Sequence, residues 1–158
     1  MIVNGWTLLF HQAIIDQLTK LADAYGRARK SDSRNFRANP NVKLFAAISK
    51  LMLEIIPADP GRPEYRQGNT LGPEYRHWFR VKILGRFRLF FRYDSRAKLI
   101  VYAWVNDKRS LRQSDGRNDP YEVFRRMLRS GNPPNDWNAL VKAARTLPKE
   151  IAQMPAPD

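Results

Sequence analysis

The sequence predicts an α+β domain in which a twisted antiparallel sheet supports helices. Three apolar runs rich in aromatic and β-branched residues follow one another at 78–84, 87–93 and 99–105. Short polar segments at 85–86 and 94–98 separate these runs, which is the pattern of a three-stranded antiparallel meander. Apolar residues at helical spacing lie before and after the meander. Because strands and helices are segregated along the chain, the α+β class is expected.

Two helices are expected before the meander, after a short strand. Apolar side chains alternate within residues 3–11, so this segment is predicted to be an edge strand. A helix is predicted over 12–28, where apolar residues recur every three or four positions. A second helix is expected to begin at a cap formed by Asn39 or Asn41 and to end at Pro57. Both helices are expected to pack on one face of the sheet.

A long segment between the second helix and the meander predicts a functional or mobile loop. Residues 57–76 are rich in proline and glycine, and loops of this length are uncommon in compact domains. Its glycines match neither a P-loop nor a dinucleotide-binding fingerprint. Leu71 is expected to pin the loop to the core.

The helix that follows the meander has a well-specified start. Asp119 can cap it, Pro120 suits its first turn, and Glu122 lies three residues after the cap. Gly131 suits the position just beyond its end. Tyr121 could reach the outer face of the sheet, although its spacing with later apolar residues favours core packing.

The length of 158 residues fits one domain with a substantial core. A short helix is predicted over 137–145. We expect a single domain over residues 1–146 and a flexible C-terminal tail over 147–158, because the tail is short and contains several prolines.

The composition limits the function and the compartment. The net charge of +13 favours a nucleic acid or an acidic protein as partner. The absence of cysteine excludes disulfides and thiolate metal sites, and it fits a reducing cytoplasm. No apolar run approaches membrane-spanning length, and the first residues lack the pattern of a signal peptide. A cytoplasmic protein without a membrane span is therefore expected.

Basic side chains gather on one predicted face of the meander. Period-two alternation places apolar residues of the first strand on the core side and Arg80 and Lys82 on the outer side. Arg86 and Arg88 have the same outward parity on the facing strand. Arg112, just beyond the third strand, is expected to join them. This cluster predicts a phosphate site, whereas the plainer interpretation is a solvated basic face.

Other residues near the meander are candidates for binding or proton transfer. Tyr102 and Trp104 are expected to share one face of the third strand and to stack on a base. His77 could serve as an acid or a base near neutral pH, or simply pack beside a tryptophan. Asn106 and Asp107 end the third strand, where a carboxylate could act as base, orient the arginines or only form a turn.

The residue types present favour RNA chemistry that needs no cofactor. The acidic residues are scattered and show neither DxD nor HExxH spacing, so a metal-dependent nuclease is poorly supported. A nucleophile elbow is absent, and cysteine catalysis is impossible. The 2′-OH of RNA can instead attack the neighbouring phosphate while arginines stabilise the negative charge that develops.

Several motifs in order carry a resemblance that runs along nearly the whole chain. They are VNGW at 3–6, WFRVKILGRFRLFFRY at 78–93, WVND at 104–107, LR at 111–112, DPYEVFRRMLRSG at 119–131 and NPPNDW at 132–137. With these motifs the chain resembles the YhaV toxin family, a branch of the RelE-like toxins of type II toxin–antitoxin modules. The resemblance implies a RelE-like fold and an endoribonuclease that cleaves mRNA, often on or with the ribosome.

The resemblance also implies a mechanism, a partner and roles for particular residues. Related toxins use a metal-independent reaction of the 2′-OH, and a PrlF-like antitoxin with an AbrB-type fold would neutralise the toxin in a hetero-oligomer. Arg80 and Lys82 match the basic pair of RelE-like toxins, and Arg88 matches their central strand arginine. Arg112 and Tyr121 fall near the C-terminal arginine and tyrosine of that wider family.

Three interpretations therefore stand beside one another. The first is a toxin ribonuclease in which Arg80, Lys82 and Arg88 hold the scissile phosphate and Asp107 or His77 transfers protons. The second is a non-catalytic RNA- or ribosome-binding module that uses the same face. The third is a scaffold whose basic face docks an acidic protein.

Overall fold

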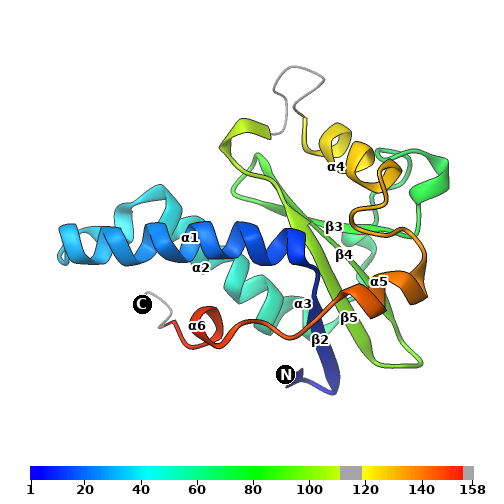
Figure 1. The fold of residues 1–158 in the computed structure, drawn as a ribbon, viewed down its shortest axis with the longest axis horizontal. Coiled ribbons are helices and arrows are strands. Elements are labelled where there is room, and N and C mark those ends of the chain that lie inside the picture. The colour runs from blue at the N-terminus through cyan, green and yellow to red at the C-terminus, as the bar shows by residue number, and fades with distance from the viewer. Residues whose placement is uncertain (111–118, 155–158) are drawn as a thin grey trace.

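A computed structural model describes residues 1–110 and 119–154 (Figure 1). Within these residues a five-stranded sheet has the order β1-β2-β5-β4-β3. The strands are β1 Ile2–Val3, β2 Trp6–Phe10, β3 Phe79–Ile83, β4 Phe87–Asp94 and β5 Leu99–Val105. The helices are α1 Gln12–Ser31, α2 Pro40–Lys50, α3 Ile56–Ala58, α4 Pro120–Arg129, α5 Trp137–Ala143 and α6 Lys149–Ala152. The α+β class is confirmed.

The sheet is mixed, not purely antiparallel as expected. β2 pairs in parallel with β5, with Leu8 opposite Ile100, and the remaining pairs are antiparallel. A parallel pair needs a long crossover, and here α1, α2, the following loop, β3 and β4 all lie between β2 and β5 in the chain. The expectation that the first strand lies at the edge is wrong, because the two-residue strand β1 covers its outer side.

The meander β3-β4-β5 is confirmed, and it contains a bulge. Phe90 pairs with Trp104, whereas Phe91 pairs with Tyr102, so Ala103 is an additional residue in β5. An additional residue reverses the alternation of side chains beyond it. Tyr102 therefore points to one side of the sheet and Trp104 to the other, and the expectation that they share a face is wrong.

Helices cover both faces of the sheet, as Figure 1 shows. α1 and α2 lie on one side, where their buried residues form one core with Leu8, Phe91 and Tyr102. α4 and α5 lie on the other side, where Phe90 and Phe124 belong to a second core. The outer face, predicted as a cationic surface, is thus partly a core, and its end near the β3–β4 turn carries exposed basic side chains.

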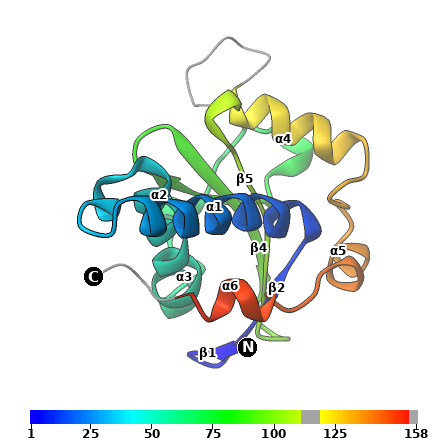
Figure 2. The same ribbon diagram turned by 60° about the vertical axis from the view of Figure 1, so that its left-hand side comes forward.

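The helix starts follow their capping residues. The ring of His11 caps α1 by accepting a hydrogen bond through Nδ1 from the backbone of Ala13. Asn39 caps α2 in the same way, as one of the two expected candidates. α2 continues through a π-helical turn, Leu51–Ile55, into α3, so the helical path ends one residue beyond Pro57. Figure 2 shows α1 and α2 side by side.

The segment between α3 and β3 is folded onto the core. It contains two short 3-10 turns, Pro63–Tyr65 and Pro73–Tyr75. Leu71 is fully buried, as predicted. Buried Gln67 donates a hydrogen bond to the carbonyl of Tyr75 and so closes the loop on itself. The loop therefore has a fixed shape where it meets β3.

The C-terminal segments confirm one prediction and correct another. Asp119 caps α4 through a hydrogen bond from the backbone of Tyr121, and Gly131 follows the helix with a φ of 81°. Residues 147–154 do not form a loose tail, because Leu147 and Ile151 are buried in the core that includes α1. Their apolar side chains offset the entropy of ordering a short segment. The helices in the described part of the chain are too short or too polar to cross a membrane.

Candidate functional site

The hydroxyl of Tyr121 joins two arginines of the β3–β4 ribbon. It accepts a hydrogen bond from Nε of Arg80 at 2.9 Å and another from Nε of Arg88 at 3.1 Å. Arg80 lies on β3, Arg88 on β4 and Tyr121 in the first turn of α4. Two predicted phosphate ligands and the tyrosine thus meet at one point, which we call the arginine clamp.

Arg88 is buried, with 6% of its surface exposed, and its contacts are neutral acceptors. Its Nη1 donates to the carbonyls of Gly85 and Phe87, both at 2.9 Å. Gly85 has a φ of 82°, which glycine adopts without strain and which aims its carbonyl at the guanidinium. Among the described residues neither Arg80 nor Arg88 forms an ion pair. A buried cation without a counter-charge favours an incoming anion.

Arg80 is held from its other side by the loop that precedes β3. Its Nη1 donates to the carbonyl of Glu64 at 2.7 Å. Lys82 lies two residues further along β3, directly opposite Arg88, and its side chain is exposed. Arg86, in the turn between the strands, is also exposed. Two fixed guanidiniums and two exposed cations therefore surround the β3–β4 turn.

A stack of aromatic rings fixes the position of Tyr121. Its ring meets that of Phe90 edge to face at 5.6 Å. Phe90 stacks on Phe124 at 4.3 Å, and Trp104 lies parallel to Phe124 at 5.9 Å. Trp104 is thus a buried support of the clamp, and its ring has no open face for a nucleobase as the sequence had suggested.

Tyr102, the other predicted stacking residue, lies inside the opposite core. Its side chain is fully buried, and its hydroxyl donates to the carbonyl of Met52 at 2.7 Å. Burial raises the pKa of Tyr102 well above its ordinary value. The residue ties β5 to the π-helical turn, and no base could reach it without opening this core.

His77 lies at the far end of the sheet from the β3–β4 turn. Its Nε2 is 2.7 Å from Oδ1 of Asn135, an oxygen that also accepts from the indole of Trp78. Burial lowers the pKa of His77; the Asn135 contact raises it, and the charge of Arg92 lowers it further. A neutral imidazole suits a base, but in this structure it faces a pocket that includes Arg92 and Trp137 instead of the clamp.

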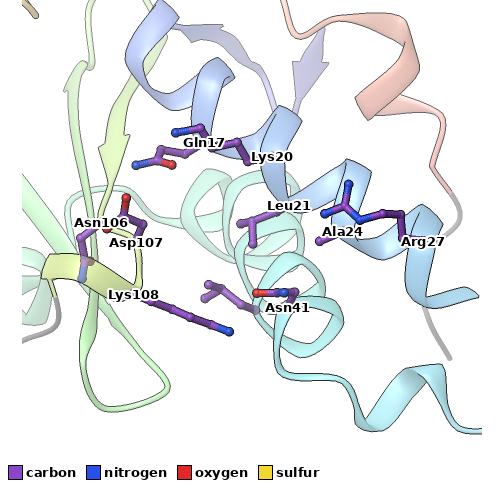
Figure 3. Close-up of a pocket in the computed structure, with 10 residues that line it drawn as sticks. Gln17, Lys20, Leu21, Ala24, Arg27, Asn41, Asn106, Asp107 and Lys108 are labelled. Carbon is purple, nitrogen blue, oxygen red and sulfur yellow. The ribbon is translucent and has the colours of Figure 1, made fainter.

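Asp107 and Asn106 lie at the opposite end, after β5. Since β3 and β5 both run antiparallel to β4, the start of β3 and the end of β5 lie at opposite ends of the strands. Oδ1 of Asp107 accepts from Ser110 at 3.3 Å, and the residue lines a pocket of about 280 Å³ with α1 and α2 (Figure 3). His77 and Asp107 therefore cannot form one catalytic pair.

Asn106 is a buried hub beneath the clamp. Its Oδ1 accepts from the backbone of Arg88 at 2.7 Å. Its Nδ2 donates to the carbonyls of Arg86 and Ser110, at 3.3 and 2.6 Å. The side chain is thus occupied by three backbone groups. It joins the β3–β4 turn to the end of β5 and fixes the position of the Arg88 backbone.

The structure brings together a part of the predicted set. Arg80, Arg88 and Tyr121 are in contact, with Lys82 and Arg86 beside them, while Arg112 lies outside the described residues. Sequence reasoning missed the carbonyl of Glu64, because a backbone acceptor leaves no compositional signal. In the described part of the chain no three histidine, aspartate or glutamate side chains gather where they could hold a metal ion.

Comparison with known proteins connects this geometry to a family. Residues 8–145 match the YhaV toxin family, described as a toxin with endonuclease activity, of toxin–antitoxin system. The Ribonuclease toxin YhaV of Escherichia coli (strain K12) is 37% identical over 142 residues, which cover 89% of this chain and 92% of that protein. Toxin YhaV of Escherichia coli O157:H7 and of strain O6:H1 give the same values.

No solved structure gives a significant match, so the RelE-like expectation has no structural neighbour to support it. The family match, in contrast, runs from within β2 to just beyond α5 and includes every residue of the arginine clamp. The chain therefore belongs to the YhaV family of endonuclease toxins from toxin–antitoxin systems.

Proposed function

We propose that this protein is a metal-independent endoribonuclease that cleaves mRNA, on or with the ribosome, and thereby inhibits translation and growth. The observation that carries the proposal is the arginine clamp, in which Arg80 and Arg88 share the hydroxyl of Tyr121. A related protein is named a ribonuclease, which supports RNA as the substrate. A PrlF-like antitoxin is the proposed partner that neutralises the activity.

The reaction uses a nucleophile that RNA itself supplies. The 2′-oxygen attacks the adjacent phosphorus and loses its proton to a base, while the bond from phosphorus to the 5′-oxygen breaks and that oxygen gains a proton. The products are a 2′,3′-cyclic phosphate and a 5′-hydroxyl. A DNA strand lacks the nucleophile and is not cleaved. No metal or cofactor is required by this balance of atoms.

The arginine clamp acts on the phosphate. Nη2 of Arg80 and Nη2 of Arg88 form no hydrogen bond with the described residues, so both can donate to the phosphoryl oxygens. Because the guanidiniums are already held by Tyr121 and by backbone carbonyls, they stabilise the developing charge without rearranging. Lys82, exposed opposite Arg88, adds a mobile ammonium beside the phosphate or the leaving oxygen.

Proton transfer is assigned to groups at the clamp in preference to His77 or Asp107. The exposed ammonium of Lys82 and the hydroxyl of Tyr121 adjoin the phosphate position. His77 lies at the far end of β3, and Asp107, although it follows β5 at the near end, accepts from Ser110 and lines the pocket with α1 and α2. Tyr121 holds both arginines, so its first role is positioning. Lys82 is the exposed donor nearest to Arg88 along the ladder.

The test is cleavage of a defined RNA in the presence of EDTA, with both new ends identified. We expect a 2′,3′-cyclic phosphate and a 5′-hydroxyl, and no cleavage when the nucleotide before the scissile phosphate is 2′-deoxy. RNA that binds but stays intact would support the non-catalytic binding module instead. Cleavage that EDTA abolishes would show that the metal-independent reaction is wrong.

A further inference from the structure

Two adjoining pockets form a groove on the α1–α2 side of the β3–β4 turn. One pocket, of about 280 Å³, lies between α1, α2 and the end of β5 (Figure 3). The other, of about 500 Å³, lies between the start of α2 and the β3–β4 turn. Asn41, Leu44 and Lys108 line both pockets. We call the pair the α2–hairpin groove.

The floor of the groove is apolar. Leu21 and Ala24 line the first pocket, and Pro40 and Phe87 line the second. Leu84 lies at the mouth of the second pocket with 60% of its surface exposed, and its φ of 47° is uncommon for a residue with a side chain. The exposed side chain of Leu84 therefore extends the apolar lining of the second pocket onto the surface.

The rim of the groove is cationic. Lys20 and Arg27 of α1, Lys43 of α2 and Lys108 after β5 line the pockets and are exposed. Within the described residues none of these four forms an ion pair. Figure 3 shows Lys108 reaching across the first pocket toward α2. Asp107 is the single carboxylate among the described residues that line the two pockets.

An apolar floor inside a cationic rim selects one class of partner. RNA would satisfy the lysines, but its phosphates and sugars gain nothing from burying Leu21, Leu44 and Leu84. A protein segment that carries both carboxylates and large apolar side chains satisfies rim and floor together. The observations therefore favour an acidic amphipathic protein segment over nucleic acid.

We propose that the α2–hairpin groove docks an acidic amphipathic segment of the antitoxin, with one apolar side chain anchored in each pocket. The identity of the partner rests on the proposed function. The groove shares the β3–β4 turn with the arginine clamp, because Phe87 lines the groove while its carbonyl holds Arg88. A segment bound there contacts the same turn that positions Arg88, on the side opposite Tyr121.

The test measures binding of the full chain to its cognate antitoxin by calorimetry. The variant Lys43→Glu/Leu84→Asp reverses a rim charge and removes the exposed leucine, both at exposed positions where folding is preserved. We expect the dissociation constant to rise at least tenfold. The control Arg129→Glu/Lys142→Glu places similar charge changes on exposed positions of α4 and α5 and should leave binding within twofold.

RNA cleavage by the free variants separates this proposal from the proposed function. Unchanged cleavage with weakened antitoxin binding supports the groove. Unchanged antitoxin binding by Lys43→Glu/Leu84→Asp overturns the proposal. A loss of RNA affinity in this variant also overturns it, because the groove would then be an RNA-binding surface. If the unaltered protein cleaves no RNA, the proposed function fails, while the calorimetric comparison still decides whether the groove docks the antitoxin.

Discussion

Arg80 and Arg88 donate their Nε hydrogens to one oxygen, the hydroxyl of Tyr121, from diagonal positions on neighbouring strands. Two cations held on one neutral acceptor repel each other, and an anion placed between them relieves that repulsion. The arrangement therefore costs stability in the free protein. Under the proposed function, a bound phosphate offsets this cost, and it does so more strongly as negative charge develops in the transition state, which is the requirement for catalysis.

The first prediction concerns the acceptor. Tyr121→Phe keeps the ring against Phe90 but removes the oxygen that both arginines share. We expect kcat for RNA cleavage to fall on the order of 100-fold, as for the loss of one preorganised contact, with unfolding free energy lowered by about 1 kcal/mol. Single-turnover cleavage and urea denaturation measure the two effects. A variant with wild-type kcat would contradict the positioning role.

The second prediction compares Arg88 of β4 with Arg96, which follows the same strand. Arg88→Lys retains the charge but cannot reach Tyr121 and two carbonyls with a planar fork, so cleavage should fall at least tenfold. Arg96→Lys, at an exposed turn between β4 and β5, is the matched control and should cleave normally. Equal loss of cleavage in both variants would indicate a general effect of replacing arginine by lysine or a defect in folding. Cleavage and circular dichroism together distinguish these outcomes.

Local patterns predicted the elements well. The meander follows from alternating aromatic and β-branched runs. The start of α4 follows from Asp119, which accepts a hydrogen bond from the backbone of Tyr121, and from Pro120, which suits the first turn. The placement of Arg80 and Arg88 on the same face of the ribbon also follows from parity, since β3 and β4 pair without a break. These features depend on neighbours within a few residues, which is the range that sequence patterns report.

Long-range features were not predictable from such patterns. The bulge beside Phe90 shifts the pairing register of β5 by one residue, and no residue type at that position predicts it. That shift separates Tyr102 from Trp104 and removes both from the proposed RNA surface. Pairing of β2 with β5, and burial of Ile151 on α1, depend on segments far apart in the chain.

A third prediction concerns the hub beneath the clamp. Asn106→Ala leaves the backbone N–H of Arg88 and two carbonyls without their partners in a buried site. We expect a loss of about 1–3 kcal/mol in unfolding free energy, together with reduced cleavage because Arg88 is displaced. Guanidinium denaturation and the cleavage assay provide the measurements. Asn138→Ala, at an exposed position of α5, is a suitable control and should change neither.

A fourth prediction concerns pH. Burial lowers the pKa of His11 below its ordinary 6.5, with a smaller opposing effect of Asp16. The folded state therefore binds fewer protons than the unfolded state just below pH 6.5, and stability must fall as the pH falls through that region. Protonation would also destroy the Nδ1 acceptor that caps α1. Urea denaturation between pH 8 and about pH 5 should show this loss.

The variant His11→Asn isolates the contribution of His11 to this pH dependence. Asparagine is a good helix cap and does not titrate, so α1 keeps its cap while the pH dependence of stability becomes weaker. His77, whose pKa is also lowered, contributes to the remaining slope. A slope as steep in His11→Asn as in the unaltered protein would show that the cap is not the titrating group.

The fifth prediction asks whether Tyr102 contacts RNA or only the core. Tyr102→Phe removes the hydroxyl that donates to the carbonyl of Met52 and leaves that buried carbonyl unpaired. Unfolding free energy should fall by about 1–3 kcal/mol, because the acceptor loses its partner without access to water. RNA affinity and kcat at a temperature where the variant is fully folded should equal those of the unaltered protein. A selective loss of RNA affinity in this variant would require the core around Tyr102 to open when RNA binds, and the packing of β5 against α1 argues against such an opening.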